Sequence, residues 1–330
     1  MSSITRIGSA ALLFLLAIGA PVYGEFPKPA PAKPEGVIIG VYVTHVYDLN
    51  PGNNSFTVGF WAWARHRSRE IRPLDTLEIY QAKEVKAEPT VSIAKGGEIW
   101  DQRYFRAVIR YSWDMREYPF DEYNLPIEFG EGIYDTNTVT YVADKRQSGI
   151  EPDAMPAHWG IARFRFDTGA MQYPSTFGDP TLTKPLTSMA FGKVVIEVER
   201  QHGAIFFKLL IGAYVAFLLA VISYRIKTDQ PTLFSARVGL LVGSLFATIV
   251  NLRATESVLG RTEDFTLVDQ IHLLITVYIL IAAVSALISR RLCEHERIEK
   301  SREVDGISFI LFTASFIAIN VVMISRAVMY

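Results

Sequence analysis

The chain has one cysteine among its 330 residues, Cys293, and no excess of charge of either sign. A lone cysteine cannot form a disulfide within the chain, so an exported domain must rely on its core for stability. The formal net charge of -1 argues against a nucleic-acid partner.

The sequence also lacks the motifs on which enzyme chemistry depends. It has six histidines with no metal-ligand spacing among them, no phosphate-binding loop and no nucleophile beside a base. The sequence therefore predicts a protein that is not an enzyme and that uses no metal or cofactor. Its apolar segments show no internal repeat, which disfavours a transporter.

Apolar residues are abundant. They make up 50% of the chain while 20% of the residues are charged, so the composition indicates a soluble part joined to a membrane part. Residues 1–24, with Arg6 before an apolar stretch of about twelve residues, predict a signal peptide cut after Gly24. The alternative is an anchor helix, for which that stretch is short. Residues 25–36 form a proline-rich leader.

Residues 37–202 are dominated by a period of two. Between Phe56 and Trp63 the even-numbered positions share one face of a strand, and Trp61 and Trp63 lie on the other. The same alternation recurs in the segments 103–113, 163–167 and 193–199. Turn residues at 51–54 and 96–97 separate such strands. The pattern predicts an extracellular all-β sandwich, immunoglobulin-like, of about ten strands.

Residues 203–330 predict a transmembrane domain of four helices. Their expected bounds are about 204–224, 233–254, 265–290 and 305–327. Lysine and arginine collect in the connections after the first helix and after the third, which places those connections in the cytoplasm. The signal peptide independently places the sandwich outside. Both the sandwich and the C-terminus, Tyr330, are thus expected on the periplasmic or extracellular side of the cell membrane.

Several short motifs occur in a characteristic order. Tyr118-Pro119-Phe120-Asp121 looks like an aromatic-Pro-Phe-Asp docking loop, and Arg200 matches a pre-membrane arginine. Leu77–Tyr80, Trp159 and Phe191 look like three successive binding loops, and Phe265–Gln270 resembles the start of a third membrane helix. In these features the chain resembles the pentameric ligand-gated ion channels, the Cys-loop receptor superfamily. It is most similar to their bacterial members, because no cysteines flank the docking loop.

The resemblance implies a homopentamer in a bacterial inner membrane. It also implies a pore for inorganic ions lined by the second helix, and coupling between sandwich and bundle through Pro119, Phe120, Asp121 and Arg200. Two places depart from the family pattern. Gly212 stands near the usual proline of the first helix, and Ser235-Ala236-Arg237 lacks the glutamate of many cation-selective members. The choice between cations and anions therefore stays open.

The second predicted helix carries one stripe of pore candidates. At 100° per residue this stripe comprises Gly239, Gly243, Phe246, Val250, Arg253 and Ser257. In five copies the glycines would leave a wide cytoplasmic half, and Phe246 with Val250 would form an apolar neck that closes by dewetting. The alternative is a small-residue packing face. Arg253 either influences selectivity or snorkels at the helix end, with Glu256 close enough to neutralise it.

Aromatic side chains off the core face of the sandwich are the ligand candidates. On one subunit they are Tyr80, Trp159, Tyr173, Phe177 and Phe191, and on the neighbouring subunit they are Trp61 and Trp63. Such rings suit a small cationic or aromatic ligand. The alternative for each ring is packing in the core or at an interface.

Two functions are consistent with these features. The first is a pentameric ligand-gated ion channel opened by a ligand between neighbouring sandwiches. The alternative is a non-conducting periplasmic sensor anchored by four helices. A sensor would need a cytoplasmic partner, and the short inner connections offer little surface for one.

Overall fold

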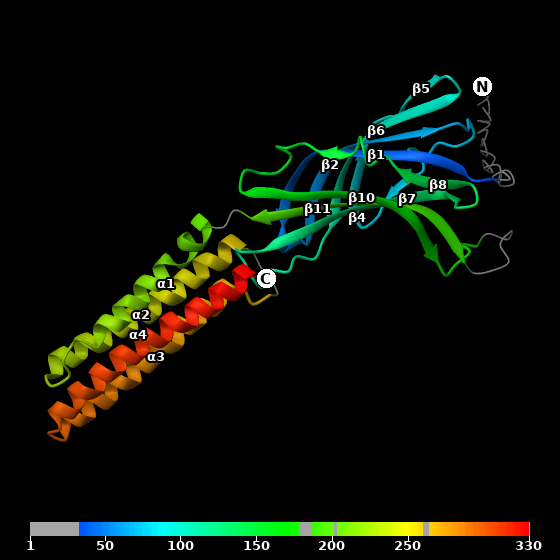
Figure 1. Cartoon of the computed structure of the whole chain (residues 1–330). Coiled ribbons are helices and arrows are strands. Elements are labelled where there is room, and N and C mark those ends of the chain that lie inside the picture. The colour runs from blue at the N-terminus through cyan, green and yellow to red at the C-terminus, as the bar shows by residue number, and fades with distance from the viewer. Residues whose placement is uncertain (1–32, 179–185, 201–202, 260–263, 330) are drawn as a thin grey trace, which may run out of the picture.

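The computed structural model describes residues 33–178, 186–200, 203–259 and 264–329. It contains a β-rich N-terminal region followed by four long helices, which confirms the order of parts expected from the sequence (Figure 1). The predicted signal peptide, most of the proline-rich leader and Tyr330 lie outside the described residues.

Eleven strands are described, close to the ten expected. They are β1 (Glu35–Asn50), β2 (Ser55–His66), β3 (Leu77–Ile79), β4 (Ala82–Ala87), β5 (Val91–Lys95), β6 (Glu98–Arg110), β7 (Glu122–Asp135), β8 (Val139–Ala143), β9 (Gly149–Ile150), β10 (Trp159–Tyr173) and β11 (Thr187–Arg200). The larger, seven-stranded sheet has the order β4-β6-β2-β1-β8, with β5 paired to β6 and β9 to β1. The smaller sheet has the order β10-β11-β7-β3. Strands β8 and β9 run parallel to β1, and the other pairs are antiparallel.

An apolar core lies between the two sheets. The alternation expected in β2 is confirmed, because Phe56, Val58 and Phe60 are fully buried while Trp61 is 39% exposed on the outer face. The smaller sheet contributes fully buried residues from β7 and β11, namely Leu125, Ile127, Phe129, Val194 and Ile196. Removing this apolar surface from water is the main source of the sandwich's stability.

The predicted turns lie where the sequence places them. Residues Pro51–Asn53 form a short 3-10 helix between β1 and β2, and the Asn50 side chain accepts a hydrogen bond from the Asn53 amide at 3.0 Å. Between β5 and β6, Gly96 and Gly97 have φ values of +60° and +81°, which favour glycine because it has no Cβ. These turns fix the register of the strands they join.

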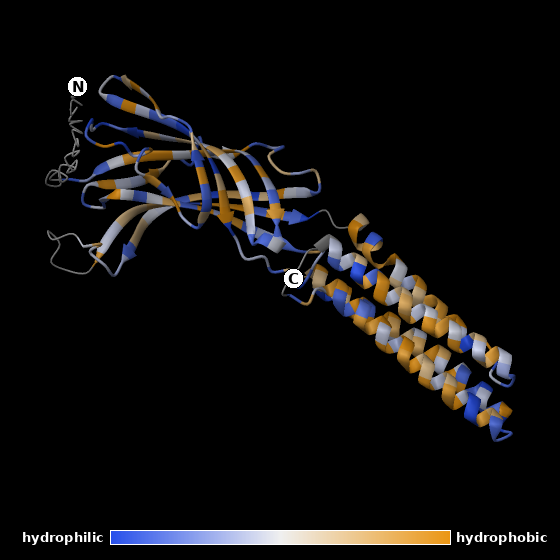
Figure 2. Ribbon diagram, turned by 180° about the vertical axis from the view of Figure 1, so that it is seen from behind, coloured by the Kyte–Doolittle hydropathy of each residue, from blue (hydrophilic) through white to orange (hydrophobic). Residues whose placement is uncertain are grey.

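The four helices are α1 (Gly203–Ser223), α2 (Pro231–Leu259), α3 (Leu267–Glu294) and α4 (Ile298–Met329). Each is long and apolar enough to cross a membrane, and Figure 2 shows the apolar residues concentrated along them. Helix α3 begins after a capping box, in which Thr266 and Asp269 bond each other's backbone amides. Helix α4 begins seven residues before the expected position 305, because the charged segment after Ile298 continues the helix.

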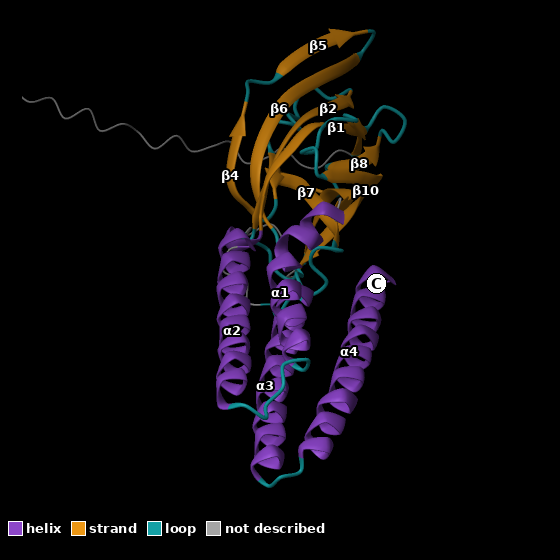
Figure 3. Ribbon diagram, turned by 90° about the vertical axis from the view of Figure 1, so that its left-hand side faces the viewer, coloured by secondary structure: helices purple, strands orange, loops and turns teal. Residues whose placement is uncertain are grey.

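The helices pack around α1 and α3. Figure 3 shows α2 and α4 on either side of these two helices. An aromatic group joins α1, α3 and α4, with the rings of Phe217 and Phe316 stacked at 3.6 Å and Tyr278 edge-on to Phe312 at 4.6 Å. Close ring packing of this kind supplies the van der Waals contacts that hold helices together in lipid.

Candidate functional site

Four of the predicted ligand residues gather on the outer face of the smaller sheet. We call Tyr80, Tyr173, Phe177 and Phe191 the β11 aromatic cluster. The rings of Tyr80 and Phe191 stack at 6.0 Å, and those of Tyr173 and Phe177 meet edge-to-face at 5.3 Å. Phe191 pairs with Gly169 of β10 and with Gly130 of β7, so both neighbouring positions in the sheet lack a side chain. The Tyr80 ring occupies the space over Gly130, and the space over Gly169 is open.

The floor of the β11 aromatic cluster requires glycine. A Cβ at Gly130 would lie 2.1 Å from the Tyr80 hydroxyl, so any larger residue would displace this ring. Burial, with a hydrogen bond to Tyr173, raises the pKa of Tyr80 above its ordinary value. The phenol is therefore neutral, and its ring presents an uncharged π face.

Two carboxylates lie close to this cluster. Glu78 of β3 extends over Gly132 on the outer face. Glu131 points into the core, where Oε2 accepts a hydrogen bond from the Tyr141 hydroxyl at 3.2 Å and Oε1 accepts one from the Ile133 amide at 3.2 Å. Burial raises the pKa of Glu131 despite these hydrogen bonds. Glu131 is not among the predicted site residues, because nothing in its local pattern indicates that it is buried.

The structure does not bring Trp159 to the β11 aromatic cluster. Trp159 begins β10 and pairs with Arg200, whereas the cluster lies beside Gly169, ten residues along the same strand. At about 3.3 Å per residue this separation is about 33 Å. Trp159 is buried, and its ring packs against the Arg200 guanidinium at 4.1 Å. Trp159 therefore lies beside Arg200, one of the predicted coupling residues.

Trp61 and Trp63 lie on the outer face of the larger sheet, as expected. Trp61 packs against Tyr104 with ring centroids 5.0 Å apart, and the Tyr104 hydroxyl lies 3.2 Å from His45 Nε2. We call His45, Trp61 and Tyr104 the β2 aromatic cluster. Burial, with a smaller contribution from Arg106, lowers the pKa of His45, so this ring is neutral at neutral pH.

Trp63 borders a separate hollow on the same face. Its Nε1 donates to Asp144 Oδ2 at 3.2 Å. The hollow has a volume of about 540 Å³ and is lined by Tyr42, Trp63, Arg65, Trp100, Asp144, Arg146 and Gln147. Tyr104 could have been selected from the sequence, because it alternates with the core residue Phe105. His45 could not, since a bulge between Val43 and His45 shifts the register of β1 there.

The two aromatic clusters lie on opposite faces of one sandwich. Facing sheets pack about 10 Å apart, and side chains extend outward from each of them. A small ligand therefore cannot touch both clusters of the same chain. A site that uses both needs the sandwich of a second copy.

The predicted pair between Asp121 and Arg200 is confirmed. Arg200 Nε donates to Asp121 Oδ1 and Nη2 donates to Oδ2, each at 3.1 Å. Both side chains are almost fully buried. The guanidinium is further held between the rings of Trp159, at 4.1 Å, and Tyr118, at 4.9 Å. Two charge-assisted hydrogen bonds and two cation–π contacts thus fix the end of β11, from which the chain enters α1.

The docking loop reaches the bundle through backbone and ring contacts. The Leu267 amide donates to the Arg116 carbonyl, and the Met115 amide donates to Asp264 Oδ2, both at 2.9 Å. Phe120 packs on Phe206 of α1 at 5.4 Å. Pro119 follows a cis peptide bond in this loop. Pro119 and Phe120 are predicted from the family resemblance to press on the connection 261–265, of which residues 261–263 lie outside the described residues.

Helix α2 has two opposite stripes. The stripe packed against the other helices is largely polar and contains Arg237, Leu241, Ser244, Thr248 and Thr255. All the residues predicted to line a pore, Gly239, Gly243, Phe246, Val250, Arg253 and Ser257, are exposed in the single chain. At 100° per residue Leu241, Leu245, Ile249 and Leu252 are predicted to lie mostly off this stripe. The structure buries Leu241 and half-buries Leu245 and Leu252, whereas Ile249 is 46% exposed. Arg253 donates to Glu256 at 2.7 Å, as the three-residue spacing predicts.

Gly212 makes room for a polar contact between helices. Its backbone lies so close to α2 that an added Cβ would be 3.0 Å from the Asn251 amide group. Asn251 Oδ1 accepts a hydrogen bond from the Ala213 amide at 3.1 Å and lies 2.9 Å from His272 Nε2. One side chain thus joins α1, α2 and α3.

Within the described ranges, no three or more His, Cys, Asp or Glu residues are grouped closely enough to hold a metal ion. Comparison with known proteins finds no family model that matches the chain and no curated protein that matches it significantly. The class of protein that the fold defines is therefore stated from the architecture alone: a β-sandwich joined to four apolar helices, an arrangement compatible with a channel or a sensor.

Proposed function

We propose that the protein is a ligand-gated ion channel formed by five copies of the chain around a pore lined by α2. The observation that carries this proposal is the orientation of α2, whose predicted pore stripe points away from its own bundle. Arg253 and Ser257 on that stripe are costly to place against lipid and favourable against water. A ring of subunits gives this stripe a water-filled axis.

The neck of the pore is formed by Phe246 and Val250. These side chains are 69% and 50% exposed in the single chain, and they lie one helical turn apart. Five phenyl rings around an axis exclude water from a narrow passage, so the closed state is a dewetted neck. Gly239 and Gly243 leave the passage wider on one side of it.

The ligand lies between neighbouring sandwiches, with the β11 aromatic cluster on one subunit and the β2 aromatic cluster on the next. Neutral rings with Glu78 beside them suit a small cation, which binds over π faces and near a carboxylate. Because the two clusters lie on opposite faces of one chain, a ligand that contacts both clusters bridges two neighbouring subunits. The Asp121–Arg200 pair then transmits movement of the sandwich to α1.

The proposed orientation places the sandwich outside the bacterial inner membrane and both charged connections inside. It follows from the distribution of lysine and arginine and from the predicted signal peptide. The permeant species are inorganic ions.

Single-channel recording of the purified protein in a planar bilayer tests the channel. Phe246→Ser is expected to raise the resting conductance, because a hydroxyl-lined neck stays wet at the same radius. Leu245→Ser is the matched control and is expected to change it little. An equally large effect at Leu245 would mean that α2 is rotated from this assignment. No current from the wild type or from either variant would favour the non-conducting sensor.

The ligand site is tested by Trp61→Ala and Phe191→Ala. Each is expected to raise the ligand concentration for half-maximal opening by about tenfold, the equivalent of one lost cation–π contact, without changing conductance. Ile93→Ala, on the exposed strand β5, removes an apolar side chain away from both clusters and serves as the control. Altered conductance with unchanged ligand sensitivity would remove Trp61 and Phe191 from the site.

A further inference from the structure

The outer face of the larger sheet carries two arginines without an acidic partner. Arg106 and Arg110 are exposed on β6, whereas Phe105, Ala107 and Ile109, which alternate with them, are buried in the core. Among the described residues, no carboxylate lies within 4.0 Å of the charged nitrogens of either arginine. The two positions are four residues apart on the strand, a distance of about 13 Å. Their positive charge is therefore not neutralised within the described part of the chain.

These arginines lie on the side of the molecule where the proposed pore runs. Figure 3 shows β4, the strand beside β6, above α2, with α4 on the opposite side of the bundle. Arg110 ends β6, and the chain continues from it into the docking loop, whose Arg116 carbonyl accepts a hydrogen bond from the Leu267 amide of α3. Arg110 is therefore at the membrane end of the strand, and Arg106 is farther out. A ring of subunits with the exposed stripe of α2 at its centre places five copies of each arginine around the same axis, above the outer mouth of the pore.

Helix α2 itself adds no unpaired charge to this pathway. Its one carboxylate, Glu256, accepts a hydrogen bond from Arg253 at 2.7 Å. The other cation of the helix, Arg237, is fully buried and paired with Asp305 of α4. The first turn of α2 has no acidic residue. A pore lined by this helix therefore lacks the ring of carboxylates that attracts cations in cation channels.

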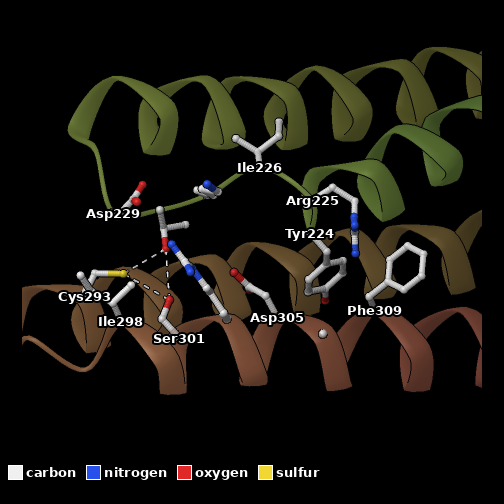
Figure 4. Close-up of a pocket in the computed structure, with 13 residues that line it drawn as sticks. Tyr224, Arg225, Ile226, Asp229, Cys293, Ile298, Ser301, Asp305 and Phe309 are labelled. Atoms are coloured by element: carbon white, nitrogen blue, oxygen red, sulfur yellow. Dashed lines mark hydrogen bonds between the residues drawn. The ribbon is translucent and has the colours of Figure 1, made fainter.

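The cations at the other end of the bundle face away from α2. Arg225 and Lys227, in the connection after α1, line a pocket of about 240 Å³ that is closed on its far side by the first turns of α4 (Figure 4). The Arg225 guanidinium lies 6.0 Å from the centre of the Phe309 ring on α4. The charge that Arg106 and Arg110 bring to the pathway is therefore at its outer entrance.

We propose that the channel favours anions, and that Arg106 and Arg110 form two positive rings which concentrate anions above the outer mouth of the pore. Like charges around an enclosed, water-filled space produce a potential that raises the local concentration of counter-ions. Rings of arginine favour anions in the same way that rings of carboxylates favour cations. This inference rests on the proposed channel and adds its ion preference.

Reversal potentials in a planar bilayer test the ion preference. The Phe246→Ser variant, expected to conduct at rest, supplies a current without a ligand. With KCl more concentrated on one side, its current is expected to reverse close to the equilibrium potential of chloride. Reversal close to the equilibrium potential of potassium would overturn the anion preference and leave the channel intact. No current from either the wild type or Phe246→Ser would overturn both, so the two failures are distinguishable.

The double variant Arg106→Gln/Arg110→Gln, made in the Phe246→Ser background, tests the two rings. In dilute KCl it is expected to lower the unitary conductance by about twofold or more, because the local concentration of chloride falls. In about 1 M KCl, where the Debye length is about 3 Å, the variant and its parent are expected to agree within about 20%. A loss of conductance that persists in concentrated KCl would overturn the electrostatic role of these arginines.

The matched control is Arg163→Gln/Arg165→Gln in the same background. It removes the same charge from exposed positions on β10, in the smaller sheet on the opposite side of the sandwich. Because these positions lie far from the proposed axis, the control is expected to change the conductance by less than about 20% in dilute KCl. Equal effects of the two double variants would overturn the assignment of Arg106 and Arg110 to the ion pathway.

Discussion

The sandwich and helix α2 place their polar groups in opposite ways. In β2 the inward side chains from Phe56 to Ala64 are apolar and the outward face is aromatic and polar, whereas α2 buries Arg237, Ser244 and Thr248 and exposes Phe246. Water surrounds the sandwich, so apolar burial drives its assembly. Lipid offers no such drive between helices, so the bundle depends on close packing and on hydrogen bonds between helices. Phenylalanine is therefore a core residue in β2, as at Phe56, and an exposed residue on α2, as at Phe246.

The largest expected effect is the loss of the buried ion pair that joins α2 to α4. Arg237 is fully buried and bonds both oxygens of Asp305, to which Ser289 also donates. Arg237→Met leaves a buried carboxylate unpaired and is expected to cost about 3–5 kcal/mol, seen as a lower unfolding temperature in detergent. Arg237→Met combined with Asp305→Leu is expected to recover most of that loss. An unchanged unfolding temperature for Arg237→Met would show that α2 and α4 do not depend on this pair.

The next effect concerns the corresponding pair at the boundary between the two regions. Asp121→Ala is expected to cost about 2–3 kcal/mol, less than at Arg237 because the rings of Trp159 and Tyr118 still hold Arg200. Tryptophan fluorescence during denaturation measures the loss of stability. Recording of channel opening in a bilayer measures the effect on gating. Asp114→Ala, which removes an exposed partner of Arg116, is the control and is expected to change stability by less than about 0.5 kcal/mol. Normal assembly and opening of Asp121→Ala would make the pair incidental.

A smaller effect is expected from the contact among α1, α2 and α3. Asn251→Ala removes the acceptor that joins Ala213 and His272 and is expected to cost about 1 kcal/mol in detergent. Thr255→Val is the control, since its hydroxyl bonds only the Asn251 carbonyl of its own helix. Equal effects of the two substitutions would mean that hydrogen bonds between helices do not distinguish the bundle from the sandwich.

The smallest effect is a pH dependence inside the sandwich. Burial raises the pKa of Glu131 above its ordinary value of 4.5, so the folded state binds its proton more tightly than the unfolded state does. The stability from this group is complete below the ordinary pKa and is lost as the pH rises through the raised folded pKa. Glu131→Gln is expected to stabilise the sandwich at neutral pH and to flatten its pH dependence in thermal melts. Glu128→Gln, on the outer face of β7, should do neither.

The order and type of the main elements were predictable because the spacing of apolar residues along the chain depends on which face of each strand or helix is buried. Alternation in β2 predicted a buried even-numbered face, and the spacing along α2 predicted a stripe of six residues that all turn away from the bundle, although Ile249 outside that stripe is exposed as well. Asp121 and Arg200 were paired correctly from a motif. Trp159 was assigned to the ligand aromatics from the resemblance, whereas strand register places it beside Arg200.

Other contacts join residues far apart in the chain and leave no local signal. Asp305 lies 68 residues after Arg237, and no pattern around either residue identifies its partner. The role of Gly212 depends on how closely α2 approaches it, and His45 enters its cluster through a bulge in β1. The pocket beside Asp229 exists only because the connection after α1, the end of α3 and the first turns of α4 meet there.

The sequence by itself determined that this chain has a sandwich followed by four apolar helices, because periodicity and run length are set by the solvent around each segment. It also determined the two faces of α2, since helical phase is a property of spacing alone. Only the tertiary structure decided that the two aromatic clusters lie on opposite faces and that the connection after α1 forms a pocket with the start of α4. Those juxtapositions depend on strand register and on helix packing, which are fixed by contacts across the whole fold.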